Sequence, residues 1–554
     1  MKQLSLSIAL AVALNTSAIA QDKPSLIVQI TVDGLRGDLL HRYMDSFGEG
    51  GFRRLTENGV WYTNAHHRHA NTETIVGHTT LATGAHPSEH GMIGNAWFDR
   101  ADGRLGYNIE DPDYALLPVS GFEGKVDQVD PSQAAAETNG RSPVNILVTT
   151  FGDELWKSNN GRSKIVGLSG KDRSAVAMAG HVGDAYWLSS STGAFETSNY
   201  YHDAYPQWVI DWNSGRPADA MLGGQWELAD PIGTYLLADN DDRSYETDLK
   251  GFGRTFPHTY GQPEDGLYYT QVLISPLGDR ITADFAKAAI IGEELGQDSF
   301  TDFLGVSFAG VDGTQHFFGP SSLEAEEMVR QLDRTLAELL TFIDDQIDAD
   351  RVLYVLSGDH GMPEMPEFMA EQGLAVARND TDTLQADLNL MLTERFDILD
   401  GIRAFYRPYI YLDNEAISVE GLDRDEVIRA VVRQLENTAG IAVAMPAAPL
   451  PEQIGHTVEP LIRNNYHPLR SGDIYVAQAP YSFLYQAGPI AVMHGSPWNY
   501  DTHVPIIFAG DGIEAKRVSR SVATVDVAVT LADILGTTQP SGAAGEVLHE
   551  VVGN

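Results

Sequence analysis

The stretch SLIVQITVDG, residues 25–34, joins a strand pattern to a potential metal ligand. Residues 26–32 form a nearly continuous apolar run, which is typical of a strand buried on both faces of a parallel or mixed sheet. Asp33 follows directly, where such a strand would end. The segment therefore predicts an inner strand of an α/β sheet with a carboxylate at its C-terminal end.

Further apolar runs, separated by helical patterns, extend this prediction along the chain. The runs cover residues 303–311, 352–356, 489–493 and 504–509. Helical spacing covers residues 323–347, where Ser321 and Glu324 form a capping-box pattern. A second helix is expected over 525–535, with Thr524 as N-cap and Gly536 after its end. This alternation predicts an α/β fold with a mostly parallel central sheet flanked by helices.

The chain is long enough for a large core with additions. Its 554 residues exceed the size at which one hydrophobic core stops growing. We expect a catalytic core at 21–363 and 483–554, with cap insertions near 97–139 and 186–266. Residues 364–482 carry their own strand and helix patterns in FYRPYIYLD, RDEVIRAVVRQLE and GDIYVAQ. They are predicted to form an inserted subdomain.

Residues 1–20 have the pattern of a secretory signal peptide. They contain one lysine, an apolar stretch over 4–14 and the small-residue sequence Ala18-Ile19-Ala20. No other stretch of the sequence is long and apolar enough to span a bilayer. We therefore expect a periplasmic or secreted protein without stable membrane insertion.

Composition limits the chemistry that is possible. The absence of cysteine excludes disulfides, thiolate nucleophiles and cysteine-bound zinc, so a metal would need Asp, Glu, His or hydroxyl ligands. The formal net charge of −40 argues against general binding of nucleic acid or anionic lipid. A site that handles phosphate would therefore need locally concentrated positive charge.

Potential metal ligands follow four of the apolar runs. They are Asp33, Asp312, Asp359 and His494. In open α/β sheets, ligands bind beyond the carboxyl ends of the strands, so these side chains are expected at one rim. Asp312 and His316 have helical spacing, and His360 adjoins Asp359. Taken singly, each of the four that follow a run fits a turn residue or N-cap better than a ligand, but together the carboxylates and imidazoles suit zinc, with manganese, iron or cobalt as alternatives.

Thr74 lies where a loop runs into a predicted helix, in NTETIVGHT at 71–79. Backbone N–H groups at a helix N-terminus stabilise an alkoxide and a phosphoryl oxygen. Ionising the hydroxyl would require a divalent metal, which lowers the pKa of a bound hydroxyl by many units. Read in isolation, Thr74 also fits an ordinary N-cap.

Seven motifs in the same order resemble those of one enzyme family. They are TVDGLRGD (31–38), NTETIVGHTTLATG (71–84), HGMIGNAWFD (90–99), SGKDRSAVAMAGH (169–181), GVDGTQHFFGP (310–320), SGDHGM (357–362) and HGSPWNYDTHVPIIFAG (494–510). With these motifs, nearly the whole mature chain resembles the alkaline phosphatase superfamily. Within it, the chain is similar to the PafA-like phosphate-insensitive alkaline phosphatases, which are grouped with type I phosphodiesterases and nucleotide pyrophosphatases.

The resemblance implies a role for each matching residue. Thr74 looks like the nucleophile. One of two zinc ions would be held by Asp33, Thr74, Asp359 and His360. The other would be held by Asp312, His316 and His494, with His503 as the weaker alternative to His494. Asn95, Lys171 and Arg173 resemble the residues that bind the non-bridging phosphoryl oxygens.

The resemblance therefore implies an exported, zinc-dependent alkaline phosphatase that hydrolyses small-molecule phosphate monoesters through a phosphothreonine intermediate. The Lys171 and Arg173 cations favour monoesters, which carry roughly one more negative charge than diesters. The main alternative is a phosphodiesterase or nucleotide pyrophosphatase with the same two metals, for which nucleotides would be substrates. A non-catalytic exported metal- or glycan-binding module is the alternative from another class.

Overall fold

A computed structural model describes residues 23–119, 128–448 and 457–552 of the chain. The predicted signal peptide at 1–20 lies outside the described residues. Within them, each helix is too short or too polar to cross a membrane.

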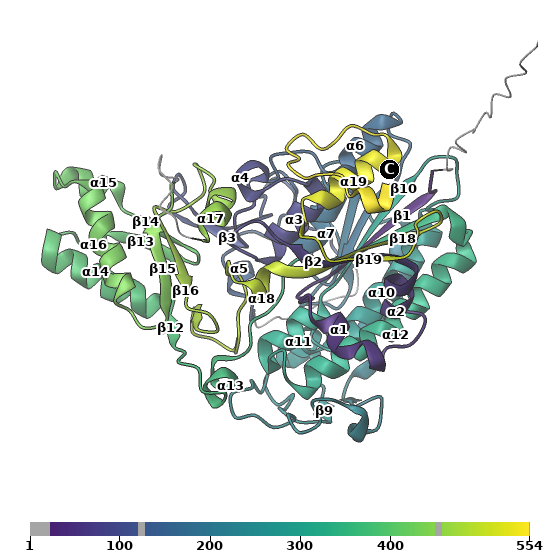
Figure 1. Ribbon diagram of the computed structural model, residues 1–554, viewed down its shortest axis with the longest axis horizontal. Coiled ribbons are helices and arrows are strands. Elements are labelled where there is room, and N and C mark those ends of the chain that lie inside the picture. The colour runs from purple at the N-terminus through teal and green to yellow at the C-terminus, as the bar shows by residue number, and fades with distance from the viewer. Residues whose placement is uncertain (1–22, 120–127, 449–456, 553–554) are drawn as a thin grey trace, which may run out of the picture.

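A large central sheet organises the chain (Figure 1). Along one path its order is β19 (Lys516–Val518), β2 (Gly59–His66), β18 (His503–Gly510), β11 (Val352–Gly358), β1 (Leu26–Val32), β10 (Asp302–Phe308), β5 (Ile165–Ser169), β6 (Asp184–Leu188) and β7 (Phe195–Glu196), while β20 (Val522–Ala523) pairs with β2. β11, β1, β10, β5 and β6 run parallel. β18 is antiparallel to both its neighbours, and β7 is antiparallel to β6. The predicted mostly parallel sheet is thus confirmed.

Strand β1 lies inside the sheet and packs on both faces. In register, Val32 lies beside Phe308 of β10 and Gly358 of β11, so the three strands end together. Val28 and Ile30 belong to one hydrophobic core, whereas Ile27 belongs to another. This burial on both faces explains why the sequence of β1 is a nearly continuous apolar run.

Helices cover both faces of the sheet, as Figure 1 shows. On one face lie α3 (Thr74–Thr83), α4 (Pro87–His90), α6 (Phe151–Ser158), α7 (Asp172–Ala179), α19 (Asp526–Leu535) and α20 (His549–Val552). On the other lie α1 (Leu39–Tyr43), α2 (Phe52–Asn58), α8 (Gln207–Ser214), α9 (Tyr268–Leu273), α10 (Pro276–Gly292), α11 (Gly310–Phe318) and α12 (Leu323–Gln346). The fold is therefore a three-layer α/β arrangement.

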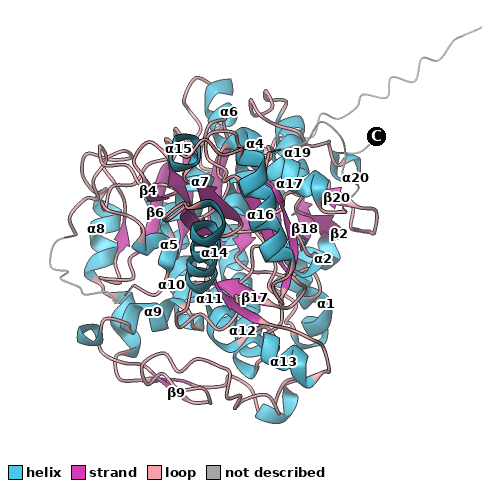
Figure 2. Cartoon of the chain, turned by 90° about the vertical axis from the view of Figure 1, so that its left-hand side faces the viewer, coloured by secondary structure: helices cyan, strands magenta, loops and turns pink. Residues whose placement is uncertain are grey.

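A second sheet is built from residues of the predicted subdomain. Its order is β13 (Ile402–Tyr406), β14 (Tyr409–Leu412), β16 (Ile474–Gln478) and β15 (Ile441–Pro446), all antiparallel. The associated helices are α13 (Pro366–Glu371), α14 (Thr381–Phe396), α15 (Asn414–Val419), α16 (Arg424–Glu436) and α17 (Glu459–Asn465). In Figure 1 this sheet lies between α14–α16 and the rest of the molecule, and Figure 2 views the molecule from the α14 and α16 side. The boundaries of the subdomain at 364 and 482 stay a prediction.

Short elements connect these parts. They are β3 (Ala96–Asp99) with β4 (Arg104–Tyr107), β8 (Gln225–Trp226) with β9 (His258–Thr259), β12 (Arg378–Asp380) with β17 (Phe483–Tyr485), α5 (Pro131–Ala134) and α18 (Asn499–Thr502). The stretch beginning at 186 is not wholly an insertion, because β6 and β7 extend the central sheet.

The predicted strand at 489–493 is wrong. These residues form an irregular segment, in which Ala491 N and Val492 N donate hydrogen bonds to His316 O. Ala491 and Val492 are buried in a small cluster with Met362 and Met365. The segment is apolar because it is buried there, although it has no partner strand.

Three element boundaries also differ from the predictions. Val311 belongs to α11, because β10 ends at Phe308. Ser322 rather than Ser321 caps α12, since its side chain accepts a hydrogen bond from Ala325 N. Thr524 does not cap α19; its hydroxyl contacts His67 Nδ1 instead, whereas Gly536 ends the helix as predicted. A fourth difference concerns FYRPYIYLD, which was predicted as one strand: it contains the end of β13, a turn at residues 407–408 and all of β14.

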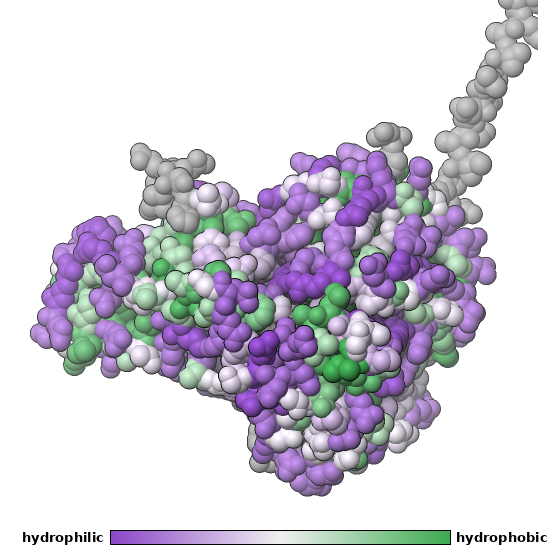
Figure 3. Space-filling model, turned by 60° about the horizontal axis from the view of Figure 1, so that its bottom comes forward, coloured by the Kyte–Doolittle hydropathy of each residue, from purple (hydrophilic) through white to green (hydrophobic). Residues whose placement is uncertain are grey.

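The visible surface is mostly hydrophilic. Figure 3 shows hydrophilic residues over most of this face, with smaller hydrophobic areas between them.

Candidate active site

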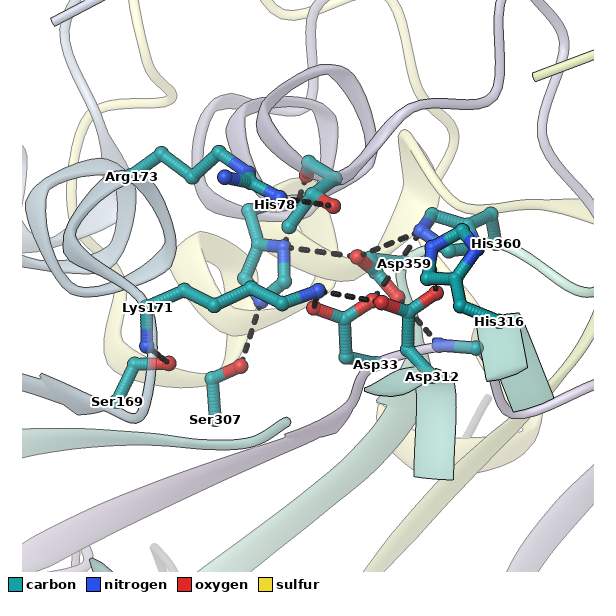
Figure 4. Close-up of polar contacts among 12 residues, drawn as sticks. Asp33, His78, Ser169, Lys171, Arg173, Ser307, Asp312, His316, Asp359 and His360 are labelled. Carbon is teal, nitrogen blue, oxygen red and sulfur yellow. Dashed lines mark hydrogen bonds and ion pairs between the residues drawn. The ribbon is translucent and has the colours of Figure 1, made fainter. Parts of the chain in front are cut away.

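Three carboxylates meet beyond the ends of β1, β10 and β11. Asp33 and Asp359 follow β1 and β11 directly, and Asp312 lies in the first turn of α11 after β10. All three are fully buried. Asp312 N donates to Asp33 O at 3.1 Å, and Gly34 N donates to Asp359 Oδ1 at 3.1 Å. Figure 4 shows the three side chains pointing toward one another. The in-register strand ends therefore bring together ligands from distant parts of the sequence.

Three histidines face this cluster through the same ring nitrogen. His360 Nε2 lies 3.2 Å from Asp33 Oδ1, while His316 Nε2 and His494 Nε2 lie 3.2 Å and 3.5 Å from Asp312 Oδ1. Each Nδ1 is hydrogen-bonded to a backbone carbonyl: that of Gly361, Val492 or Thr72. A carbonyl accepts only from N–H, so each Nδ1 carries a proton and Nε2 is the ring nitrogen that faces the carboxylates.

The cluster contains buried polar atoms that the protein leaves unpaired. In the described parts of the chain, no hydrogen-bond partner reaches Asp33 Oδ1, Asp312 Oδ1, Asp359 Oδ2 or His360 Nε2. Such atoms are costly to bury unless something else binds them. Ligand atoms of Asp312, His316 and His494 lie within 4.8 Å of one another, as do those of Asp33, Asp312 and His360. Carboxylate oxygen and imidazole nitrogen at this spacing fit a divalent transition metal.

Lys171 balances part of the negative charge. Its Nζ lies 2.7 Å from Asp33 Oδ2 and 2.5 Å from Asp312 Oδ2. Burial and Asp312 raise the pKa of Asp33, but Lys171 and His360 outweigh them and lower it to about 2. Burial disfavours the charged form of His360, but Asp359 and Asp33 raise its pKa to about 10. The carboxylates therefore form a strong cation-attracting centre.

Thr74 is the first residue of α3 and is fully buried beside this centre. Arg173 Nη2 donates to Thr74 Oγ1 at 3.4 Å, and Glu73, not Thr74, occupies the N-cap position. The helix can approach because of Gly77: a Cβ there would lie 1.9 Å from Asp359 O. The hydroxyl is thus held at a helix N-terminus, next to a guanidinium group.

Two further predicted residues border a cavity of ≈ 360 Å³. Asn95 and Arg173 line it, together with Lys171, Asp312, His316 and His494. Asn95 Oδ1 accepts a hydrogen bond from Ile75 N at 3.2 Å. Trp187, Leu273 and Phe317 give the same cavity apolar walls. The cavity therefore has both charged and apolar side chains in its walls.

His503 lies elsewhere. Its Nε2 is 3.0 Å from Thr63 O, and its ring stacks on that of His66. Of the two alternatives, the structure places His494 in the cluster.

Two polar residues at the site, His78 and Asp130, were not predicted from the sequence. His78 Nδ1 lies 3.1 Å from Asp359 Oδ2, and its Nε2 lies 2.8 Å from Ser307 Oγ. Its position four residues after Thr74 was a signal, because that spacing shares a helix face. Asp130 Oδ2 accepts from Arg173 Nη1 at 2.8 Å, and nothing in the local sequence indicated that pairing.

The chain is similar to known proteins in sequence and in fold. Residues 27–497 match the family described as type I phosphodiesterase / nucleotide pyrophosphatase. The chain is 34% identical over 537 residues to a protein of Myroides odoratus named calcium-transporting ATPase, covering 96% of this chain and 95% of that one. It is 32% identical over 539 residues to alkaline phosphatase PafA of Elizabethkingia meningoseptica, with 96% and 95% covered.

The fold agrees with that second relative. The crystal structure of wild-type alkaline phosphatase PafA superposes with a TM-score of 0.85 at 30% identity, covering 96% of this chain and 99% of that chain. Together with the cation-attracting site, these matches identify the chain as an alkaline phosphatase of the PafA type, and it belongs to the type I phosphodiesterase / nucleotide pyrophosphatase family.

Proposed function

We propose that the protein is an exported, two-zinc alkaline phosphatase that hydrolyses small-molecule phosphate monoesters through a phosphothreonine at Thr74. The observation that carries the proposal is the contact between Arg173 and the buried Thr74 hydroxyl, beside a cluster of unpaired carboxylate and imidazole atoms. A hydroxyl in contact with a cation that lines the cavity, beside candidate metal ligands, provides the groups that phosphoryl transfer requires.

Two ligand sets are proposed for zinc. One is Asp33, Thr74, Asp359 and His360; the other is Asp312, His316 and His494. Asp312 also lies close to Asp33 and His360, so the sets adjoin one another. Bound zinc would lower the pKa of a coordinated hydroxyl or water and stabilise negative charge on phosphoryl oxygens.

Thr74 would act as nucleophile in the first displacement. Its Oγ1 attacks phosphorus, the ester P–O bond breaks, and the alcohol leaves. In the second displacement water attacks phosphorus, the Thr74 P–O bond breaks, and inorganic phosphate is released. Arg173 and the amide group of Asn95 would hold the non-bridging oxygens in both steps.

A solved variant supports these assignments. The relative PafA has been crystallised with one threonine, one asparagine, one lysine and one arginine replaced. The replaced threonine and asparagine have the same sequence separation as Thr74 and Asn95, and the replaced lysine and arginine have that of Lys171 and Arg173.

Lys171 would favour monoesters over diesters. Its Nζ lies between Asp33 and Asp312, and Lys171 lines the cavity. Once metal ions neutralise these carboxylates, the ammonium group would be free to attract the additional charge of a monoester. A phosphodiesterase with the same ligands would not depend on this cation.

Replacing Thr74 tests the nucleophile. Thr74→Ala should lower kcat for a monoester by several orders of magnitude, whereas Thr74→Ser should keep a covalent route. Mass spectrometry of acid-quenched enzyme should detect a phosphorylated peptide containing Thr74. Substantial metal-dependent turnover by Thr74→Ala would contradict the proposal that Thr74 is the nucleophile.

Replacing Lys171 separates the two reaction classes. Lys171→Ala should lower kcat/KM for a monoester by roughly 10²-fold, the usual effect of losing one charge-stabilising donor, and change a matched diester far less. Equal losses on both substrates would contradict a monoester-selective role for Lys171, whereas little loss on either substrate, with the diester turned over faster, would favour the phosphodiesterase alternative.

Export rests on the sequence of residues 1–20. N-terminal sequencing of the protein recovered from the periplasm or medium should begin near Gln21.

A further inference from the structure

Arg407 reaches the nucleophile loop from the other sheet of the molecule. It follows β13 and precedes β14, at the turn of their hairpin. Its side chain is 1% exposed, and its Nη2 donates to Glu73 Oε1 at 3.4 Å. Gly495, next to His494, allows this approach, because a Cβ there would lie 2.5 Å from Arg407 Nη2. A buried cation thus links residues far apart in sequence.

Glu73 stands directly before Thr74 and is fully buried. Its second carboxylate oxygen, Oε2, accepts a hydrogen bond from Asn95 N at 2.6 Å. The same carboxylate therefore contacts Arg407 on one side and the backbone of Asn95 on the other.

Asn95 is held at both ends by groups around Thr74. Its backbone N–H is bound by Glu73, and its side-chain Oδ1 accepts from Ile75 N. Because Oδ1 is engaged, Nδ2 is the amide atom available to the cavity that Asn95 lines. The direction of this N–H donor thus depends on where Glu73 holds the Asn95 backbone.

The negative charge of the buried Glu73 carboxylate explains why a cation is needed beside it. An unpaired carboxylate is costly to bury, and it would repel a phosphoryl group bound at the adjacent Thr74. Arg407 neutralises Glu73 from the side away from Asn95, so the carboxylate remains an acceptor for the Asn95 N–H.

We propose that Arg407 is a positioning residue of the active site: through Glu73, it orients the Asn95 amide toward the phosphoryl group. The inference rests on the proposed phosphatase mechanism. It gives the β13–β14 hairpin a role in catalysis, although Arg407 is not among the described residues that line the cavity.

Double-mutant cycles test the inference. Arg407→Met should lower kcat/KM for a phosphate monoester by about 10- to 100-fold in the wild-type background, where Asn95 can be misplaced. In an Asn95→Ala background the same change should cost less than about threefold, since the group that it positions is absent. Arg407→Met combined with Glu73→Gln should recover part of the activity lost by Arg407→Met, because no unpaired charge remains.

Controls separate positioning from folding. Arg403→Met removes an exposed arginine of the same hairpin, 47% exposed and 3.6 Å from Asp413, and should stay within about twofold of wild type. Melting temperature and bound metal are measured for every variant. If Arg407→Met does not fold, kcat/KM is compared instead for Arg407→Lys and for Glu73→Gln, each in the wild-type and in the Asn95→Ala background.

The outcomes distinguish the two claims. Equal losses with and without Asn95 overturn the positioning role and leave the proposed phosphatase mechanism intact. If Asn95→Ala alone has no effect on a monoester, the proposed role of Asn95 fails, and the positioning role fails with it.

Discussion

Asp312 Oδ1 lies 3.5 Å from His494 Nε2, although the two residues come from a helix after β10 and from an irregular segment near the end of the chain. Val492 O fixes the ring of His316, and Thr72 O fixes that of His494. The metal-binding geometry is therefore coupled to the loop that precedes Thr74.

This relationship predicts the effect of losing His494. His494→Ala should lower the zinc content measured by mass spectrometry by about one ion per chain, because one ligand set loses an imidazole. A chelator should abolish activity in the wild type, and added zinc should restore it.

His503→Ala is the matched control for that variant. Its Nε2 contacts Thr63 O, so the zinc content should stay that of the wild type. Loss of metal on replacing His503 but not His494 would reverse our choice between these ligands.

A substitution at Asp130 tests how strongly Arg173 depends on the carboxylate that pairs with it. Asp130→Asn keeps the shape of the side chain but removes the charge that pairs with Arg173 Nη1. We expect about a 10-fold lower kcat/KM for a monoester, since a hydrogen bond to a charged group contributes about 1.5–3 kcal/mol. Glu57→Gln, which removes an exposed partner of Arg53, should leave the kinetics unchanged. An unchanged rate for Asp130→Asn would show that Arg173 needs no support from this carboxylate.

The observed cap of α12 predicts a stability difference between two adjacent serines. Ser322→Ala removes the acceptor for Ala325 N and should lower the free energy of unfolding by about 1 kcal/mol. Ser321→Ala, at the position favoured by the sequence pattern, should change it by less than about 0.5 kcal/mol. Urea denaturation of both variants measures the difference, and a larger loss for Ser321→Ala would contradict the observed cap.

The buried carboxyl group of Glu246 should make the stability of the folded state depend on pH. Burial, and next Glu324, raise the pKa of Glu246 from its ordinary 4.5 to about 9. The folded state therefore keeps a proton on Glu246 that the unfolded state releases, so the contribution of Glu246 to stability is most favourable below pH 4.5 and is lost as pH rises toward 9.

Glu246→Gln should remove that dependence. Its melting temperature should exceed that of the wild type by more at pH 9 than at pH 5, as measured by differential scanning calorimetry. A difference that is constant across this range would contradict the raised pKa.

Local features of the fold were predictable because they depend on neighbouring residues. The apolar pattern of β1, the helical spacing of Asp312 and His316, and the adjacency of Asp359 and His360 are each encoded within a few positions. The position of Thr74 at the start of α3 was also predictable, because a loop sequence precedes a helical sequence there. Parallel strands that end together then imply that their ligands meet.

Residues 489–493 were wrongly predicted as a strand, because burial alone produces the apolar pattern of an inner strand. An apolar run satisfies the pattern of an inner strand whether its backbone pairs with a strand or with isolated carbonyl groups. Here the backbone pairs with His316 O, which places His494 without any sheet register.

The sequence by itself supplied candidate metal ligands through residue types and short spacings, and its resemblance to a known family supplied Thr74 as the candidate nucleophile. Only the tertiary structure decided that His494 rather than His503 joins Asp312, that Asp130 supports Arg173, and that Arg407 supports Glu73. These pairings join segments brought together by packing over long sequence distances, and no local periodicity encodes such contacts.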